Sequence, residues 1–147
     1  MERTLVMLKP GVLPRRIAGE VIGRFERKGF RIIALKMFRP DKKLVETHYA
    51  EHRGKDFYEK LIDYTLSGPL IAMVLEGENA IFLARRLAGR TGITEGEPGT
   101  IRGDFAASTR LNIVHTSDSA ENAEREIRLF FGDDEIQNWE DGNSRWF

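Results

Sequence analysis

The amino-acid sequence predicts a single α/β domain in which helices pack against one sheet. Its 147 residues suit one domain with one sizeable hydrophobic core. A hydrophobic content of 41% is ordinary for a folded globular protein and argues against disorder. Segments typical of strands alternate with segments of helical periodicity, which is the pattern of an α/β sandwich. The pattern leaves strand order and direction open.

The first half of the chain contains two predicted strands and three predicted helices. Residues 4–8 form a strand-like run that ends at Lys9-Pro10-Gly11. A helix is expected from Pro14 to a stop at Gly29, because five apolar residues share one helical face: Ile17, Ala18, Val21, Ile22 and Phe25. Residues 30–37 read as the second strand. Further helices are expected from about residue 41 to residue 49 and over 57–66.

The second half begins with a continuous apolar run over residues 70–75, which suits a strand in the middle of a sheet. Asn79 is expected to cap a helix that ends before Gly89. Residues 90–111 lack periodicity, and loops of that length are often functional. Residues 112–115 form a short last strand. Asp118 and Glu121 resemble a capping box for a final helix, whose buried residues would be Ala120, Ala123, Ile127 and Phe130 or Phe131.

Composition excludes several classes of protein. The 23 basic and 23 acidic side chains cancel, so nucleic acid or an anionic membrane is not expected as the main partner. The absence of cysteine excludes disulfides and cysteine-bound zinc. No apolar run approaches the roughly 20 residues of a membrane span. The chain enters a strand-like run at once, without room for a signal peptide, and a cytoplasmic location is expected.

The two common phosphate-binding loops, GxxxxGK[ST] and GxGxxG, are absent. A protein that handles nucleotide phosphates with this sequence must therefore use side chains. Arg102 lies between glycines in residues 98–105 and could clamp phosphate oxygens with two hydrogen bonds. Arg102-Gly103-Asp104 is also an Arg-Gly-Asp triplet of the kind found in adhesion proteins, although the sequence has no export features.

His115 ends the predicted last strand, immediately before the final helix. Strand ends hold reactive groups rigidly in α/β proteins, and an imidazole can act as a nucleophile near neutral pH. Ser117 can form a hydrogen bond nearby. Glu126 should lean toward His115, because helical side chains tilt toward the helix N-terminus. Taken alone, residues 112–119 are more typical of a polar loop before a helix than of a catalytic site.

Six stretches of the chain, in order, resemble the nucleoside diphosphate kinase family between residue 2 and about residue 131. The first four are Lys9-Pro10, residues 19–22, residues 24–30 and Ser67-Gly68-Pro69. The last two, residues 98–105 and 112–119, are specific to that family in a way that a lone glycine-rich loop is not. The order, the spacing and the coverage of nearly the whole chain identify the sequence as a member of this family.

The resemblance implies a ferredoxin-like βαββαβ fold, an α+β sandwich with a four-stranded antiparallel sheet, over a single domain of residues 1–147. It also implies a ping-pong reaction. A nucleoside triphosphate, mainly ATP, would donate its γ-phosphate to His115, and a nucleoside diphosphate with any of several bases would then collect it. Mg²⁺ would be held mainly by the nucleotide phosphates, without a protein metal site. Such proteins form homo-oligomers, and a hexamer is favoured over a tetramer.

The resemblance also assigns roles to individual residues. The residues that match the family's phosphate and sugar contacts are Lys9, Arg85, Thr91, Arg102 and Asn112. Tyr49 matches the residue that stabilises the transferring group, and Glu126 and Ser117 match those that orient the imidazole. Phe57 matches the aromatic residue on which the base stacks, with Leu61 nearby. Without the family, Phe57 and Leu61 would be interpreted as core residues.

The chain departs from the family pattern at Gly11, where an Asp or Asn is usual, at Thr116, where Gly or Ala is usual, and in its tail. Two other interpretations compete. Residues 48–52 match HxxEH, in which His48 and His52 on one helix could bind zinc. The chain could also be a regulatory or nucleic-acid-binding module that has lost activity, but the presence of His115, Lys9 and Arg102 argues against this.

Overall fold

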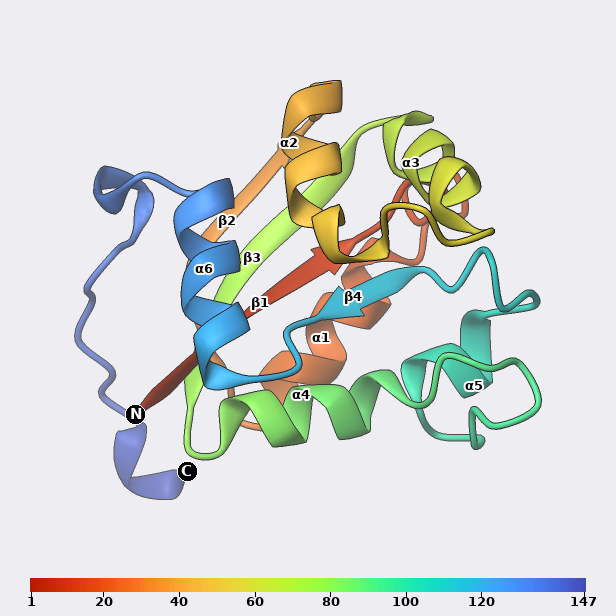
Figure 1. Ribbon diagram of the computed structural model, residues 1–147. Coiled ribbons are helices and arrows are strands. Elements are labelled where there is room, and N and C mark those ends of the chain that lie inside the picture. The colour runs from red at the N-terminus through yellow and green to blue at the C-terminus, as the bar shows by residue number, and fades with distance from the viewer.

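The computed structural model describes residues 1–147, and its centre is a sheet of four strands in the order β2-β3-β1-β4 (Figure 1). The strands are β1 (Glu2–Leu8), β2 (Arg31–Phe38), β3 (Leu70–Gly77) and β4 (Val114–Thr116). All neighbours are antiparallel, and Val6 of β1 lies opposite both Met73 and Thr116. The order and direction confirm the ferredoxin-like arrangement. All eight residues of β3 are buried, as expected for a central strand.

Helices cover both faces of the sheet, because alternate residues of a strand point to opposite faces (Figure 1). Val6 and Leu8 join the core with α1 (Ala18–Arg27) and α4 (Ala80–Ala88). Leu5 and Met7 join the core on the other face. That face carries α2 (Lys42–His48), α3 (Tyr58–Leu66) and α6 (Ala120–Phe130). The predicted single core is therefore two hydrophobic clusters separated by the sheet.

Helix α1 begins at Ala18, and the expected start at Pro14 is wrong. The preceding segment forms turns in which Arg15 N donates to Gly11 O and Arg16 N donates to Leu13 O. Arg16 has a φ of +57°, which interrupts helical geometry before Ala18. Gly29, with a φ of +104°, ends the helix as predicted.

Residues 90–111 are not entirely irregular, because they contain the short helix α5 (Ile101–Phe105). The hydroxyl of Thr100 caps it by accepting a hydrogen bond from Gly103 N at 2.9 Å. Five residues are too few to give a helical period in the sequence. Asn79 stands at the predicted N-cap of α4, but its side chain makes no capping hydrogen bond and its φ is +52°.

The start of α6 also differs from the expectation. Ser119, not Asp118, is the N-cap, and its hydroxyl accepts from Asn122 N at 3.1 Å. The carboxylate of Asp118 instead accepts from the side chain of Asn122. Ala120 is exposed, and the buried face carries Ala123, Phe130 and, in place of an apolar residue, Glu126. A charged residue is thereby placed in the interior.

The tail after α6 contains the short 3-10 turns η2 (Asp133–Glu135) and η3 (Ser144–Trp146) and runs beside β2. Gln137 N donates to Ile33 O at 2.7 Å. Trp139 Nε1 donates to Ile32 O at 2.9 Å, and the Arg31 guanidinium lies over the Trp139 ring. The tail is thus tied to part of the outer strand. None of the helices has the length and apolar character needed to cross a membrane.

Candidate active site

A cavity of about 780 Å³ opens beside the edge strand β4, and residues of α2, α3, α4, α5 and α6 line it. All but one of the residues predicted to form the site line this cavity, although they come from every part of the chain. They are Lys9, Tyr49, Phe57, Leu61, Arg85, Thr91, Arg102, Asn112, His115 and Glu126. The exception is Ser117. The cavity is also lined by His48 and by His52, which belongs to the 3-10 turn η1 (Ala50–His52).

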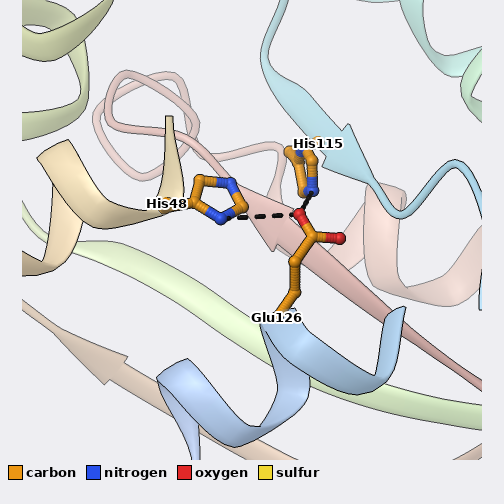
Figure 2. A group of neighbouring side chains, drawn as sticks. All are labelled: His48, His115 and Glu126. Carbon is orange, nitrogen blue, oxygen red and sulfur yellow. Dashed lines mark hydrogen bonds and ion pairs between the residues drawn. The ribbon is translucent and has the colours of Figure 1, made fainter. Parts of the chain in front are cut away.

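His115 lies in β4, opposite Met7 of β1. Its Nε2 lies 2.6 Å from Oε2 of Glu126, which reaches across from α6 (Figure 2). Because an ionised carboxylate can only accept, this contact places a proton on Nε2 and leaves the lone pair on Nδ1. Nδ1 makes no hydrogen bond within the chain. The ring is therefore oriented with its free nitrogen available for chemistry.

Glu126 is buried, with 3% of its surface exposed. Its Oε2 carries the contact with His115, and Oε1 has no hydrogen-bond partner. The side chain tilts toward the N-terminus of α6, as helical geometry predicts. Burying a carboxylate next to a half-buried imidazole is unfavourable in free energy for the folded protein. Such arrangements are typical of functional sites.

His48 was missed as a neighbour of His115. It is the last residue of α2, it is buried, and its ring packs edge-on against the His115 ring with centroids 4.6 Å apart. Its Nδ1 lies 3.4 Å from Glu126 Oε2 without a hydrogen bond (Figure 2). Burial, helped by the positive charges of neighbouring side chains, lowers the pKa of His48 well below its usual value, so the ring is neutral.

Lys9 and Arg102 supply buried positive charge. The ammonium of Lys9 donates to Asn112 Oδ1 at 2.8 Å, so Gly11 does not leave it without a partner. Burial and the charge of Arg102 lower the pKa of Lys9 to about 7. Burial, followed by the charge of Arg85, lowers the pKa of Arg102 to about 10. Both cations are held where an anionic ligand would stabilise them.

The sequence suggested that Arg102 lies in a glycine-flanked loop. In the structure it belongs to helix α5. Its Nη1 donates to Gly89 O and its Nη2 donates to Val114 O, both at 2.6 Å. The carbonyl groups hold the guanidinium between the end of α4 and β4, and its Nε is buried without a hydrogen-bond partner. Arg85, rather than Arg86, lines the cavity, as expected from the resemblance. The Arg86 guanidinium lies over Phe82 instead.

Tyr49 is buried next to the histidines, with its ring centroid 6.4 Å from that of His115. Burial raises the pKa of its hydroxyl, which makes no hydrogen bond. Phe57 lies at the rim with 46% of its surface exposed, and Leu61 is partly buried against the core. The interpretation of Phe57 as a core residue is therefore wrong, and its exposed ring is free to stack on a ligand.

Ser117 does not orient the imidazole directly, in contrast to the prediction. Its hydroxyl is buried and bonds to the backbone of Leu5, at 3.2 Å to the nitrogen and 3.4 Å to the oxygen. The residue therefore fixes the end of β4 to β1, and it affects His115 only through the strand. Thr116 is buried beside it, opposite Val6, and also lines the cavity.

Two competing motifs are excluded by local geometry. Helix α2 ends at His48, and Tyr49 leaves the helical conformation before the separate 3-10 turn Ala50–His52, in which His52 is the last residue. The two histidines of the HxxEH pattern therefore do not share a helical face. The Arg-Gly-Asp triplet lies in α5, where Asp104 is paired with Arg24 at 2.6 Å and accepts from Gly99 N. It is not an exposed loop of the adhesive kind.

Comparison with known proteins agrees with this geometry. The sequence model described as nucleoside diphosphate kinase matches residues 2–136. A nucleoside diphosphate kinase of Archaeoglobus fulgidus is 56% identical over 146 residues, which cover 99% of this chain and 97% of the relative. The enzyme of the same name from Methanocaldococcus jannaschii is 56% identical over 135 residues, covering 92% of this chain and 96% of the relative.

Solved structures give the same answer. A nucleoside diphosphate kinase family protein from Babesia bovis superposes with a TM-score of 0.95 at 43% identity, over 99% of both chains. The Halobacterium salinarum enzyme, solved in complex with CDP, also has a TM-score of 0.95, at 42% identity over 99% of this chain and 97% of the other. The non-enzymatic interpretation is set aside, because sequence, fold and cavity agree: the chain belongs to the nucleoside diphosphate kinase family and is a nucleotide-binding phosphotransferase.

Proposed function

We propose that His115 carries the phosphoryl group from a nucleoside triphosphate to a nucleoside diphosphate, with ATP as the main donor. In the first half-reaction a bond forms between His115 Nδ1 and the γ-phosphorus as the bond from that phosphorus to the diphosphate oxygen breaks. A second nucleoside diphosphate then attacks the phosphorus and frees the histidine. The contact between His115 Nε2 and Glu126 carries this proposal, because it directs the other ring nitrogen to the reaction and stabilises the positive charge that develops on the ring.

The phosphates would be held mainly by cations, since the transition state spreads negative charge over several oxygens. The lysine and arginine side chains that line the cavity are Lys9, Arg85, Arg102 and Arg110, and the first three would bind the phosphates in this scheme. Asn112 would contact the sugar and hold Lys9, and Thr91 would donate to a phosphate oxygen. Tyr49 would stabilise the group in transfer. Ser117 would act indirectly, by fixing β4 to Leu5.

Base binding would rest on Phe57, with Leu61 beneath it. An exposed aromatic ring accepts any base by stacking, because every base has a π-face. This supports broad base tolerance. The Halobacterium salinarum relative solved with CDP is an example of a family member that holds a pyrimidine nucleotide.

Mg²⁺ would be held mainly by the nucleotide. The acidic residues that line the cavity are Glu51, Asp118 and Glu126, and Glu126 is occupied by His115. Such a set offers no cage of oxygen ligands, whereas Mg²⁺ commonly uses substrate phosphates and water. The cavity therefore fits Mg²⁺ only as part of a nucleotide complex, in which it neutralises charge between the outer phosphates.

We also propose that residues 1–147 act as one catalytic domain in the cytoplasm and assemble into a homo-oligomer, with a hexamer favoured over a tetramer. The assembly is supported by β2, which forms one edge of the sheet and exposes Leu35 and Met37. An edge strand with exposed apolar residues is a common place for a second copy to bind.

The role of His115 is tested by incubating the protein with γ-labelled ATP and Mg²⁺. We expect a phosphoprotein that is labile in acid and stable in alkali, and transfer of the label to GDP or UDP. His115→Ala should abolish both steps. The matched control is His52→Ala, which removes another histidine of the cavity and should leave labelling intact. Normal labelling of His115→Ala would contradict the assignment.

A further inference from the structure

His48 has no role in the proposed transfer. Together with His115 and Glu126 it forms a group of side chains that could bind a metal ion. One ligand-type atom from each of His48, His115 and Glu126 lies within 4.8 Å of the other two. They come from α2, β4 and α6, so three packed elements hold them in place (Figure 2). This is the only group of three such side chains in the protein with their donor atoms this close together.

Three of the eight buried side-chain N and O atoms without a hydrogen-bond partner belong to the same group. Both ring nitrogens of His48 and Oε1 of Glu126 are buried without hydrogen bonds. Each residue has only 3% of its surface exposed, yet both line the cavity. Buried polar groups in native structures nearly always have partners, so atoms left without them at the wall of a cavity point to a ligand that supplies the missing interactions.

We infer that this cluster binds a zinc ion through His48, His115 and Glu126, with a fourth position open to the cavity. Two imidazoles and one carboxylate are a common donor set for zinc sites that keep an open position. Mg²⁺ prefers oxygen ligands, so the magnesium that accompanies a nucleotide should not compete well for the two imidazoles. Glu126 supplies the negative charge that offsets the cation.

The two distances from Glu126 to the histidines suit zinc after a small shift. With bonds of about 2.0–2.2 Å, ligand atoms around tetrahedral zinc lie roughly 3.3–3.5 Å apart. His48 Nδ1 and Glu126 Oε2 are already 3.4 Å apart. His115 Nε2 and Glu126 Oε2, at 2.6 Å, need to separate by less than about 1 Å as zinc takes the place of the proton between them.

Zinc at this position should inhibit phosphorylation of the enzyme, a consequence that rests on the proposed role of His115. The metal would draw electron density from the ring through Nε2 and would take Glu126 away from it. Nδ1 would then be a weaker nucleophile.

Binding is measured by titrating ZnCl₂ into the nucleotide-free full chain without a histidine tag, in a calorimeter. We expect one zinc per chain. His48→Gln should weaken binding by at least about tenfold, since even partners outside a ligand set contribute roughly 10–100-fold. His52→Gln, which removes the other histidine of the 48–52 pattern, should bind as the parent does. Unchanged affinity in His48→Gln, or an equal loss in His52→Gln, would overturn the site.

Since His48 is buried, circular dichroism must show that His48→Gln is folded. If it is not, His115→Asn decides, because that side chain is partly exposed and belongs to the same donor set. It should also weaken zinc binding at least about tenfold. Unchanged affinity in His115→Asn contradicts the inference as well.

The inhibitory effect is measured as labelling by γ-labelled ATP with one equivalent of zinc, relative to the same protein without zinc. Labelling of the parent should slow at least about tenfold, and His48→Gln should lose this sensitivity. If zinc binds but labelling is unchanged, the inhibitory role is wrong. If the parent is never labelled, with or without zinc, the proposed function fails, while the calorimetric result still stands by itself.

Discussion

At the scale of single residues, the active site places charges where water cannot fully solvate them. Lys9 is buried, makes one hydrogen bond to Asn112 and shares the cavity with Arg102. As a result, the pKa of Lys9 is about 7, because the protein's own groups stabilise the charged form only weakly. A bound phosphate supplies the missing negative charge, so nucleotide binding and protonation of Lys9 must be coupled.

This coupling predicts proton uptake when ADP with Mg²⁺ binds. Well above a pKa of 7, at about pH 8, Lys9 is mostly neutral in the free protein, and the phosphates raise its pKa so that it gains a proton. At about pH 6 it is already charged, and this uptake vanishes. Calorimetry in two buffers of different ionisation enthalpy should show uptake that approaches one proton per site at the higher pH.

Lys9→Met is the control for this measurement, because methionine has similar length and no titrating group. It should bind ADP more weakly and show no uptake from position 9. If the parent protein takes up no proton at about pH 8, Lys9 is not mostly neutral in the free protein and the argument fails.

The sequence predicted most of the residues that meet at the cavity, but for different reasons. The direction of Glu126 follows from helical geometry, whereas Arg85, Thr91 and Phe57 came only from the family resemblance. The hydroxyl of Ser117 bonds to Leu5 and not to the imidazole, because the pairing of β4 with β1 sets its partner, and a local motif does not reveal strand register. His48 was missed because its burial depends on the packing of α2 against α6.

At the scale of elements, the sequence predicted which helices and strands exist better than where they end. Apolar periodicity extends through Ile17 and Ala18, but the left-handed Arg16 delays the start of α1. Helix α5 was missed since five residues carry no period. At α6, two adjacent residues could cap the helix, and composition does not distinguish Asp118 from Ser119. Helix ends depend on which side chain reaches the backbone.

Stability measurements can show whether Ser119 or the predicted pair of Asp118 and Glu121 caps α6. Ser119→Ala should lower the free energy of unfolding by about 1 kcal/mol, because Asn122 N loses its side-chain acceptor at a helix N-terminus. Glu121→Ala, on the exposed first turn, should change stability by less than about 0.5 kcal/mol, because Glu121 makes no capping hydrogen bond. Urea denaturation of the two variants checks both values. A larger effect at Glu121 would restore the predicted capping box.

At the scale of the whole molecule, the sheet order brings distant segments to one cavity. β1 lies between β3 and β4, so Lys9 at the end of β1 meets His115 and Asn112 from the last third of the chain. Strand order could not be read from hydrophobic patterns and was predicted by resemblance alone. The same order leaves β2 at one edge, where pairing continues on only one side.

The β2 edge predicts how the chain assembles. The tail bonds to the carbonyls of Ile32 and Ile33, and its Glu135 pairs with the Lys36 side chain, but Leu35 and Met37 stay 48% and 61% exposed. These two side chains lie on the same face of β2, because residues two apart in a strand point the same way. A second copy that covers this stretch would bury both of them and could pair with the free strand edge. We therefore expect light scattering to give a mass of at least two chains, each of 16.8 kDa.

The double variant Leu35→Lys/Met37→Lys should shift that mass downward, because lysines on an edge strand oppose pairing and cannot be buried without cost. Leu35→Ile/Met37→Ile keeps the apolar surface and should keep the parent's mass. Circular dichroism should show that both variants are folded, since neither side chain belongs to the buried core. A parent protein with the mass of one chain would exclude the assembly. An unchanged mass in the lysine variant would instead move the interface away from β2, because an edge that tolerates two buried charges is not in contact with another subunit.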